Sequence, residues 1–491
     1  MENQLKILYV SSELTPFART GGLGDVSASL PKYVKDSGHD VRVIMPKYKF
    51  ISDRKYILRD VIRLRDIEVP MGDHVLSTNV KSAFLPNSKV QVYFVYHEDY
   101  FQREGIYVDP KTTKDYPDNG ERFAFFSKSA LEILKTLHWQ PDIIHCNDWQ
   151  TALIPYYLKT IYAEDPFFEN THSLLTLHNL AFQGIFEKKI LPFIGIDEKN
   201  FDKKNPLEFW GKVNYLKAGI LSADLLSTVS KTYAKEIQKS DEFGFGLQDY
   251  LRKRKKQLYG IVNGVDYNEW NPETDKFIPE KYSPSDTSGK VKNKKALLEK
   301  ANLPFSEDIP VLGIISRITE QKGFDLICDA LDDLMKLKIQ LVILGVGDKK
   351  IENCLERAAK KHKTKLALFL EFNNPLSHLI EAGSDFFLMP SRFEPCGLNQ
   401  IYSLKYGTIP IVRETGGLAD TIKDFSEESK RGYGFVFQEP SPKALLAAVK
   451  RALGYFQDED TWKKLVQRAM KQDFSWEKVV PYYINLYEKL L

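Results

Sequence analysis

The stretch ISRITEQKGFDLI, residues 315–327, brings two cations close together in the sequence. Arg317 ends an apolar run that predicts a buried strand, and Lys322 stands five positions later, directly before Gly323. The helix expected from Gly323 onward would present its free N–H groups at the same place. A guanidinium, an ammonium and a helix N-terminus can together bind a diphosphate and stabilise it as a leaving group. For either cation alone, the alternative is a solvated surface position.

Glu394 is the second candidate, in MPSRFEPCGLNQ, residues 389–400. It lies between a predicted strand and a helix expected to begin near Gly397, in a loop stiffened by Pro395. A carboxylate held there can accept hydrogen bonds from sugar hydroxyls, and the helix N-terminus favours its charge. The alternative is an ordinary helix-capping glutamate. We expect Cys396 to be a packing residue, because no basic neighbour in the sequence would activate its thiol.

Polar side chains also end two strands predicted in the N-terminal half. HCNDWQTAL places Asp148 and Trp149 at one strand end, and TLHNLAFQG places His178 and Asn179 at another. Such polar and aromatic residues are typical of a sugar site, although a lone histidine at a strand end is often structural. The sequence has no HExxH motif or histidine cluster, so we predict no catalytic metal.

The elements that must position these residues alternate between strand and helix. LKILYV, a glycine-rich turn, DVSASLPKYVKDSG and DVRVIMP form a βαβ unit, which requires a parallel sheet. TGGLGD at 20–25 and TGGLAD at 415–420 each fall at a predicted strand-to-helix turn, where glycine allows a ligand to approach the backbone. Matching loops at matching positions predict two domains facing a central cleft. The alternative is two tight turns without a ligand.

The predicted fold class is α/β, with two Rossmann-like parallel-sheet domains. We expect an N-terminal domain over 1–265 and a second domain over 310–470, where six strands alternate with helices. Residues 266–309 are rich in Pro, Ser, Lys and Asp and are interpreted as a linker. Residues 471–491 predict an amphipathic helix that could pack back on the N-terminal domain.

Composition excludes several classes of partner. A net charge of +3, from 69 basic and 66 acidic residues, argues against nucleic acid and acidic membranes. The four cysteines form no CxxC pair, so neither a disulfide framework nor a zinc site is predicted. No apolar run approaches the ~20 residues of a membrane helix, and the N-terminus runs straight into a predicted strand. We therefore expect a cytoplasmic protein; a plastid location would require a transit peptide already removed.

Several longer blocks together resemble one family over essentially the whole chain. They are RTGGLGDV, HCNDW, LHNLAFQG, LKAGILSADLLSTVS, IVNGVDYNEWNPETD, SRITEQKG and SRFEPCGLNQIYSLKYGTIPIVRETGGLADTI. In this order they are similar to the bacterial glycogen synthase and plant starch synthase family. The resemblance implies a GT-B glycosyltransferase, a hexosyltransferase that moves glucose from ADP-glucose to the non-reducing end of an α-1,4-glucan such as glycogen. It also implies retention of configuration, with no metal and no cofactor.

The resemblance also implies roles for particular residues. Arg317 and Lys322 would neutralise the departing diphosphate, Glu394 would support positive charge on the sugar, and His178 and Asp148 would face or bind the reacting sugar. The implied donor-binding residues are Arg19, Gly21, Gly22, Asp25, Tyr107, Asn263, Phe372, Cys396, Gly397, Leu398, Thr415, Gly416 and Gly417. Among these, Phe372 falls where an aromatic ring is expected beside the adenine.

Two positions depart from the family pattern. Arg19 stands where the family usually has lysine, and Asn399 where several bacterial members have threonine. Neither removes a charge, but both leave the choice between ADP-glucose and UDP-glucose open. The sequence is also compatible with a synthase that acts on short acceptors and with a non-catalytic glucan-binding protein. A nicotinamide-dependent oxidoreductase is disfavoured, because the first turn reads TGGLGD and not GxGxxG.

Overall fold

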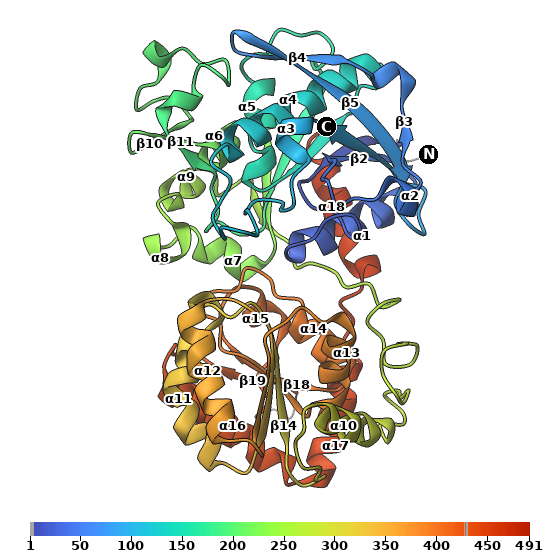
Figure 1. Ribbon diagram of the computed structural model, residues 1–491, viewed down its shortest axis with the longest axis vertical. Helices are drawn as coiled ribbons and strands as arrows, with labels where there is room; N and C mark the ends of the chain where they lie inside the picture. Colours follow the sequence, from blue (N-terminus) through green and yellow to red (C-terminus); the bar gives the residue numbers. More distant parts are fainter. Residues whose placement is uncertain (1–3, 427, 429–430) are drawn as a thin grey trace. The chain divides into compact units, whose positions relative to one another are not determined.

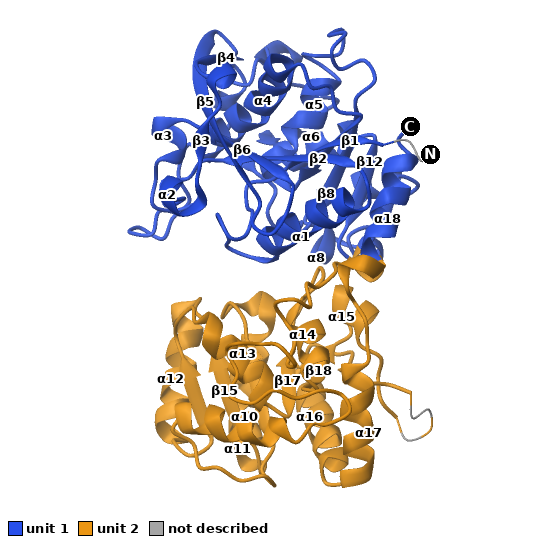
Figure 2. Ribbon diagram, turned by 90° about the vertical axis from the view of Figure 1, so that its right-hand side faces the viewer, with its two compact units in different colours: residues 1–229, 234–261, 479–491 blue, residues 230–233, 262–478 orange. Residues whose placement is uncertain are grey.

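The computed structural model describes residues 4–426, 428 and 431–491. The chain divides into two compact units, shown in blue and orange in Figure 2. Unit 1 comprises residues 1–229, 234–261 and 479–491, and unit 2 comprises residues 230–233 and 262–478. In the part of the chain that is described, no helix is long and apolar enough to cross a membrane.

Unit 1 is built on a mixed sheet whose main part is parallel. The parallel strands are β1 (Lys6–Val10), β2 (Asp40–Pro46), β6 (Gln91–Tyr96), β7 (Ile143–Asn147), β8 (His172–Leu177), β12 (Leu225–Thr228) and β13 (Leu258–Gly260). Their order in space is β6-β2-β1-β7-β8-β12-β13. Strands such as β7 are buried along their whole length, because helices cover both faces of a parallel sheet.

Smaller strands and the helices complete unit 1. Strands β3 (Arg59–Asp60), β4 (Ile67–Met71) and β5 (His74–Phe84) extend the main sheet in antiparallel fashion beyond β6. Strands β9 (Ile185–Phe186), β10 (Glu208–Phe209) and β11 (Lys212–Asn214) form a separate three-stranded sheet. The helices of eight or more residues that lie wholly in this unit are α1 (Gly22–Asp36), α4 (Asn119–Leu137) and α6 (Tyr215–Ser222).

Unit 2 contains a six-stranded sheet in which every pair is parallel. Its strands, in spatial order, are β16 (Leu366–Phe369), β15 (Gln340–Leu344), β14 (Val311–Ile315), β17 (Phe386–Met389), β18 (Ile409–Arg413) and β19 (Phe435–Phe437). Its helices include α10 (Gly289–Lys300), α11 (Phe324–Lys336), α12 (Lys349–Lys361), α13 (Asn374–Gly383), α14 (Asn399–Lys405), α15 (Gly416–Thr421), α16 (Pro442–Phe456) and α17 (Glu459–Met470). Figure 1 shows them around the sheet.

Both parallel sheets have the strand order of a Rossmann fold. Counted along the chain, the first six parallel strands of each unit run third, second, first, fourth, fifth and sixth across the sheet, and in unit 1 a seventh strand, β13, follows the sixth. The order reverses between β1 and β7 in unit 1, and between β14 and β17 in unit 2. In open α/β sheets, ligands bind beside the carboxyl ends of the strands at this reversal. The α/β class and the two Rossmann-like domains are therefore confirmed.

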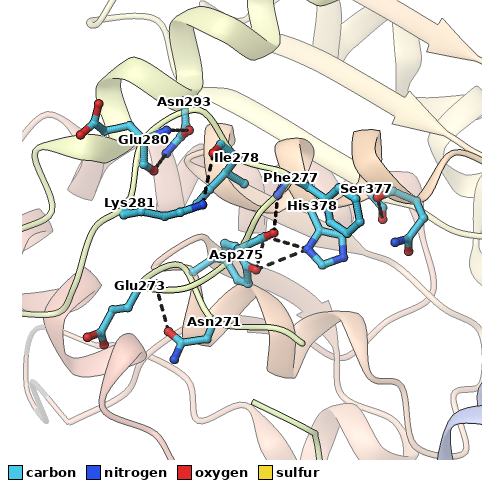
Figure 3. Close-up of polar contacts among 12 residues, drawn as sticks. Asn271, Glu273, Asp275, Phe277, Ile278, Glu280, Lys281, Asn293, Ser377 and His378 are labelled. Atoms are coloured by element: carbon cyan, nitrogen blue, oxygen red, sulfur yellow. Dashed lines mark hydrogen bonds and ion pairs between the residues drawn. The ribbon is translucent and has the colours of Figure 1, made fainter. Parts of the chain in front are cut away.

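The linker expected over 266–309 is wrong, because this segment is part of unit 2. Trp270 is buried, and its ring stacks on His378 with centroids 3.9 Å apart. Asp275 contacts His378 Nδ1 at 2.7 Å and accepts a hydrogen bond from Tyr406. Figure 3 shows the His378 ring directed at Asp275. The polar composition of the segment does not reveal these buried contacts, because their partners, His378 and Tyr406, lie more than 100 positions away in the sequence.

The C-terminal helix α18 (Trp476–Glu488) crosses the division between the units. Its residues from 479 onward belong to unit 1, as the blue segment labelled α18 in Figure 2 shows. There the Tyr487 hydroxyl lies 2.9 Å from Nδ1 of His145, a buried residue of β7. The end of the chain is thereby attached to the central strands of unit 1.

Candidate functional site

The cationic part of the candidate site lies at the strand-order reversal of unit 2. The Arg317 side chain follows β14 and is exposed, with no hydrogen-bond or ion-pair partner among the described residues. Lys322 is half-buried and ends a short 3-10 turn, Glu320–Lys322. Gly323 then adopts φ +75°, and a Cβ there would lie 2.0 Å from the Pro390 carbonyl oxygen after β17. Only glycine therefore lets the two loops approach this closely.

Glu394 lies in the loop that follows β17 and contacts Lys322. Its buried carboxylate is 2.5 Å from Lys322 Nζ and accepts a hydrogen bond of 3.1 Å from the Ser391 hydroxyl. A hydrogen bond from the Arg392 amide to the Gln321 carbonyl holds the same two loops together, and a second ion pair joins Arg392 to Asp325 in the first turn of α11. The sequence predicted separate roles for Lys322 and Glu394, and the structure makes them a pair.

The second glycine loop, Thr415–Gly417, packs against the Glu394 loop. The Gly417 amide donates a hydrogen bond of 3.0 Å to the Glu394 carbonyl. A Cβ at Gly416, where φ is +45°, would lie 1.9 Å from that carbonyl oxygen. A Cβ at Gly417 would lie 2.0 Å from the Cys396 carbonyl oxygen. The two glycines thus allow the loops after β17 and β18 to touch.

Both glycine loops lie at strand-to-helix turns, as expected, but they follow strands at different places in their sheets. Helix α1, which starts at Gly22, follows the first strand of unit 1, whereas α15 follows the fifth strand of the unit 2 sheet. A Cβ at Gly21 would meet no atom within 4 Å, and its backbone is extended. The two similar sequences therefore have different roles. Gly417 allows close packing of two loops, whereas Gly21 leaves the backbone open.

This difference predicts that alanine at the two glycines changes the unfolding temperature to different extents. We expect Gly417→Ala to lower the unfolding temperature of the protein by several degrees, because overpacking costs about 1–3 kcal/mol. Gly21→Ala should leave that temperature within about 1 °C, since surface changes are usually within ~0.5 kcal/mol. Scanning calorimetry of the two variants measures both values. Equal unfolding temperatures for the two would contradict the packing role given to Gly417.

The remaining predicted residues of unit 2 differ in their burial and contacts. The Asn399 amide donates a hydrogen bond of 2.6 Å to the Ile315 carbonyl, so this departure from the family pattern joins α14 to the end of β14. Asn263 is buried, and its Oδ1 accepts no hydrogen bond from a described residue. Gly397, with φ +73°, and Leu398 lead from Cys396 into α14. Phe372 precedes α13 and is 84% exposed.

Cys396 is buried within this loop. Burial raises the pKa of its thiol to about 12, and the backbone N–H of Asn263 donates a hydrogen bond to it. A thiol with so high a pKa is protonated at neutral pH and is a poor nucleophile. The environment fits the packing role expected for this cysteine.

In unit 1, Glu13 organises the loop that follows β1. Its buried carboxylate accepts hydrogen bonds from the Thr20 amide (2.6 Å), the Thr20 hydroxyl (2.6 Å), the Gly21 amide (3.2 Å) and the Tyr107 hydroxyl (2.8 Å). Sequence reasoning missed Glu13. The signal that could have found it was a carboxylate soon after the first strand, ahead of a glycine turn. Glu13 thereby holds two predicted donor-binding positions, Gly21 and Tyr107, in one place.

Arg19 and Asp25 lie on either side of this loop. Arg19 is half-exposed, and its Nη2 lies 2.8 Å from Asp25 Oδ2. The Thr15 hydroxyl also donates a hydrogen bond of 3.1 Å to Asp25. The charge of Arg19, where the family usually has lysine, is thus already paired in this structure.

Asp148 and His178 meet at the strand-order reversal of unit 1. Asp148 Oδ1 accepts a hydrogen bond of 2.6 Å from the His178 backbone amide and one of 3.4 Å from that of Asn179. His178 Nε2 is 2.9 Å from Asn147 Oδ1. Burial lowers the pKa of His178 to about 3, so its imidazole is neutral at physiological pH. The side chain of Asp148 therefore fixes the loop that carries His178.

Asp148 predicts a pH-dependent stability. Burial raises its pKa from 3.8 to about 7, so the folded protein holds a proton that the unfolded chain releases between these values. The stabilising contribution is complete below pH 3.8 and is lost as the pH rises through 7. Asp148→Asn does not titrate in this range. Between pH 5 and pH 8, the unfolding temperature of the variant should therefore rise relative to that of the parent, by about 2–4 °C for each kcal/mol of unfolding free energy that the parent loses. A constant difference across this range would contradict the shifted pKa.

Among the described residues, no group of three or more His, Cys, Asp or Glu side chains is arranged to hold a metal ion. The two sites present cations, carboxylates, backbone N–H groups and a neutral histidine. In unit 2 these groups can hold a diphosphate and oppose charge on a departing group. In unit 1 they offer hydrogen-bonding partners suited to hydroxyl groups.

Two Rossmann-like units with such residues at their strand-order reversals define a glycosyltransferase with the GT-B fold, and two family matches agree. Residues 6–253 match the family described as starch synthase catalytic domain, and residues 297–472 match glycosyl transferases group 1. The chain belongs to the family of glycogen and starch synthases.

Individual relatives cover nearly the whole chain. A glycogen synthase of Desulforudis audaxviator is 46% identical over 99% of this chain and 96% of its own length. A glycogen synthase of Geotalea daltonii is 44% identical over 99% of both. Among solved structures, the catalytic domain of starch synthase IV from Arabidopsis thaliana, bound to ADP and acarbose, superposes with a TM-score of 0.91 at 33% identity, covering 99% of each chain.

Proposed function

We propose that this protein transfers glucose from ADP-glucose to the 4-hydroxyl at the non-reducing end of an α-1,4-glucan, with retention of configuration. The observation that carries the proposal is the Lys322–Glu394 pair beside Arg317 at the strand-order reversal of unit 2. The similar starch synthase IV structure is bound to ADP and acarbose, which supports a nucleoside diphosphate and a glucan-like compound as ligands of this protein.

The proposed chemistry needs no protein nucleophile. Arg317 and Lys322 neutralise the diphosphate as the bond to the anomeric carbon breaks, and Glu394 supports the positive charge that develops on the sugar. The acceptor hydroxyl then bonds to the face that the diphosphate leaves, so the configuration is retained. His178, held by Asp148, and its backbone carbonyl belong to the sugar site in this scheme.

The reaction as proposed uses no cofactor and no metal, because the two cationic side chains take the part that a metal ion has in other transferases. We also propose that the protein works in the cytoplasm. All four cysteines are free, in keeping with a reducing compartment.

Transfer of labelled glucose tests this proposal. ADP-glucose and UDP-glucose are each supplied with glycogen or with maltotriose, and incorporation into the acceptor is counted. We expect ADP-glucose to give the higher kcat/KM with both acceptors. A preference for UDP-glucose would indicate a UDP-glucose-dependent synthase instead, and incorporation only into maltotriose would indicate a short-acceptor synthase. No incorporation from either donor would indicate a non-catalytic glucan-binding protein.

A further inference from the structure

Trp210 occupies a backbone position that tryptophan rarely adopts. It forms, with Gly211, the two-residue connection between β10 and β11, where Phe209 pairs with Lys212. Both connecting residues have positive φ, +51° for Trp210 and +82° for Gly211. Two-residue hairpin turns of this kind favour Asn-Gly, and a bulky residue at positive φ is strained. The turn therefore holds tryptophan at a cost in stability.

The indole is also held in place while remaining open to solvent. It is 78% exposed and stacks on Phe209, with ring centroids 4.3 Å apart. Gly246 makes room for the ring, since a Cβ there would lie 2.6 Å from the indole. Backbone strain combined with a braced, exposed aromatic ring is typical of a binding position, because neither feature contributes to the core.

The surroundings of Trp210 are polar but carry little net charge. Glu208 accepts a hydrogen bond of 2.8 Å from the Gly211 amide, and Lys212 forms an ion pair of 2.8 Å with Glu187. These exposed groups offer donors and acceptors to hydroxyl groups. Lys217 Nζ also donates a hydrogen bond of 2.5 Å to the Glu208 carbonyl. With two ammonium groups and two carboxylates among these residues, the surface fits an uncharged polyhydroxylated chain better than a polyanion such as nucleic acid.

The hairpin is continuous with the loop that carries His178. Strand β9, directly after that loop, pairs with β11, and the Gln183 side chain donates a hydrogen bond to the Phe245 carbonyl beside Gly246. Phe182, in the same loop, is 52% exposed. Figure 1 shows β10 and β11 at the periphery of unit 1, outside its main sheet. A polymer bound in the His178 region could thus contact the exposed indole of Trp210 farther out on the same unit.

We propose that Trp210 is a binding platform for the α-glucan acceptor, one on which a glucose unit stacks its apolar C–H face. The inference rests on the proposed function for the identity of the ligand. The platform would hold long glucans near the enzyme and would contribute nothing to acceptors too short to reach it.

Trp210→Asn tests the proposal without weakening the fold. Asparagine suits the positive φ, so the unfolding temperature should stay equal or rise, while the stacking surface is lost. We expect migration in native gels containing glycogen to show binding weakened about tenfold, the loss typical of a central aromatic contact. Phe84→Ala is the matched control, because Phe84 is 65% exposed at the end of β5; its retardation should equal that of the parent.

Kinetics separate this site from the reaction itself. For Trp210→Asn, KM for glycogen should rise about tenfold, with kcat/KM for maltotriose within about twofold of the parent. Unchanged retardation by glycogen, or equal losses with glycogen and maltotriose, would overturn the platform. The gel assay needs no turnover, so a protein that is retarded through Trp210 but transfers no glucose would overturn the proposed function alone.

Discussion

Lys322→Ala is expected to lower kcat by roughly 100-fold or more, and Arg317→Ala by a similar factor. The reason is that the interaction of each cation with the departing diphosphate strengthens as negative charge develops on it. Lys322→Ala has a second consequence. Glu394 loses its ion-pair partner and keeps the 3.1 Å hydrogen bond from Ser391. Steady-state kinetics with saturating donor and acceptor measure the change.

Lys336→Ala is the control for that experiment. Lys336 is an exposed lysine at the far end of α11, paired with Asp333, and its removal should leave kcat unchanged. Retardation by glycogen in native gels should be normal in all three variants, since the lost interactions concern the donor. If Lys322→Ala or Arg317→Ala turned over like the parent, the replaced residue would not stabilise the departing diphosphate.

Glu394→Gln is expected to lower kcat by about 100- to 1000-fold, with a smaller change in donor KM. The amide keeps the volume of the side chain and can still accept the hydrogen bond from Ser391. It cannot oppose positive charge on the sugar, and it leaves Lys322 without its ion-pair partner. The effect should therefore fall on the transition state more than on the bound substrate.

Glu459→Gln serves as the comparison for Glu394→Gln. Glu459 is exposed in the first turn of α17, so neutralising it should change neither kinetic constant. Circular dichroism spectra of both variants should match the parent. A Glu394→Gln enzyme that loses donor affinity and keeps its kcat would assign Glu394 to ground-state binding.

The two parallel sheets could be predicted because their strands are short apolar runs that end in polar residues. PDIIHCND carries this pattern and LKILYV is a plain apolar run, and they form the adjacent strands β7 and β1. Strands β3 to β5 were not predicted. They pair antiparallel at one side of the sheet, and β5 alternates between buried and more exposed residues only in part.

Long-range packing explains the errors in domain limits. The segment 266–309 looks like a linker because Pro, Lys and Asp dominate it, yet Trp270 and Asp275 anchor it to His378 and Tyr406. Such pairs are separated by more than 100 residues. Local composition reports which residues prefer water, and it does not report which partners a folded sheet brings to them.

The candidate site was accessible to sequence reasoning to the extent that its residues follow strands. Arg317, Lys322, Glu394, Asp148 and His178 all do so. Glu13 was missed because its importance lies in four donors, three of them seven or eight residues further on and one at Tyr107. The pairing of Lys322 with Glu394 depends on the adjacency of β14 and β17, which follows from strand order and not from spacing along the chain.

The measurement that tests the account most directly is proton NMR of the reaction of ADP-glucose with maltotriose. Retaining transfer predicts a new α-1,4 anomeric signal that grows in step with free ADP, one glucosyl linkage for each ADP released, and a rate reduced roughly 100-fold or more in Lys322→Ala. A β-configured linkage, or ADP release accompanied by free glucose and no longer chain, would contradict the account.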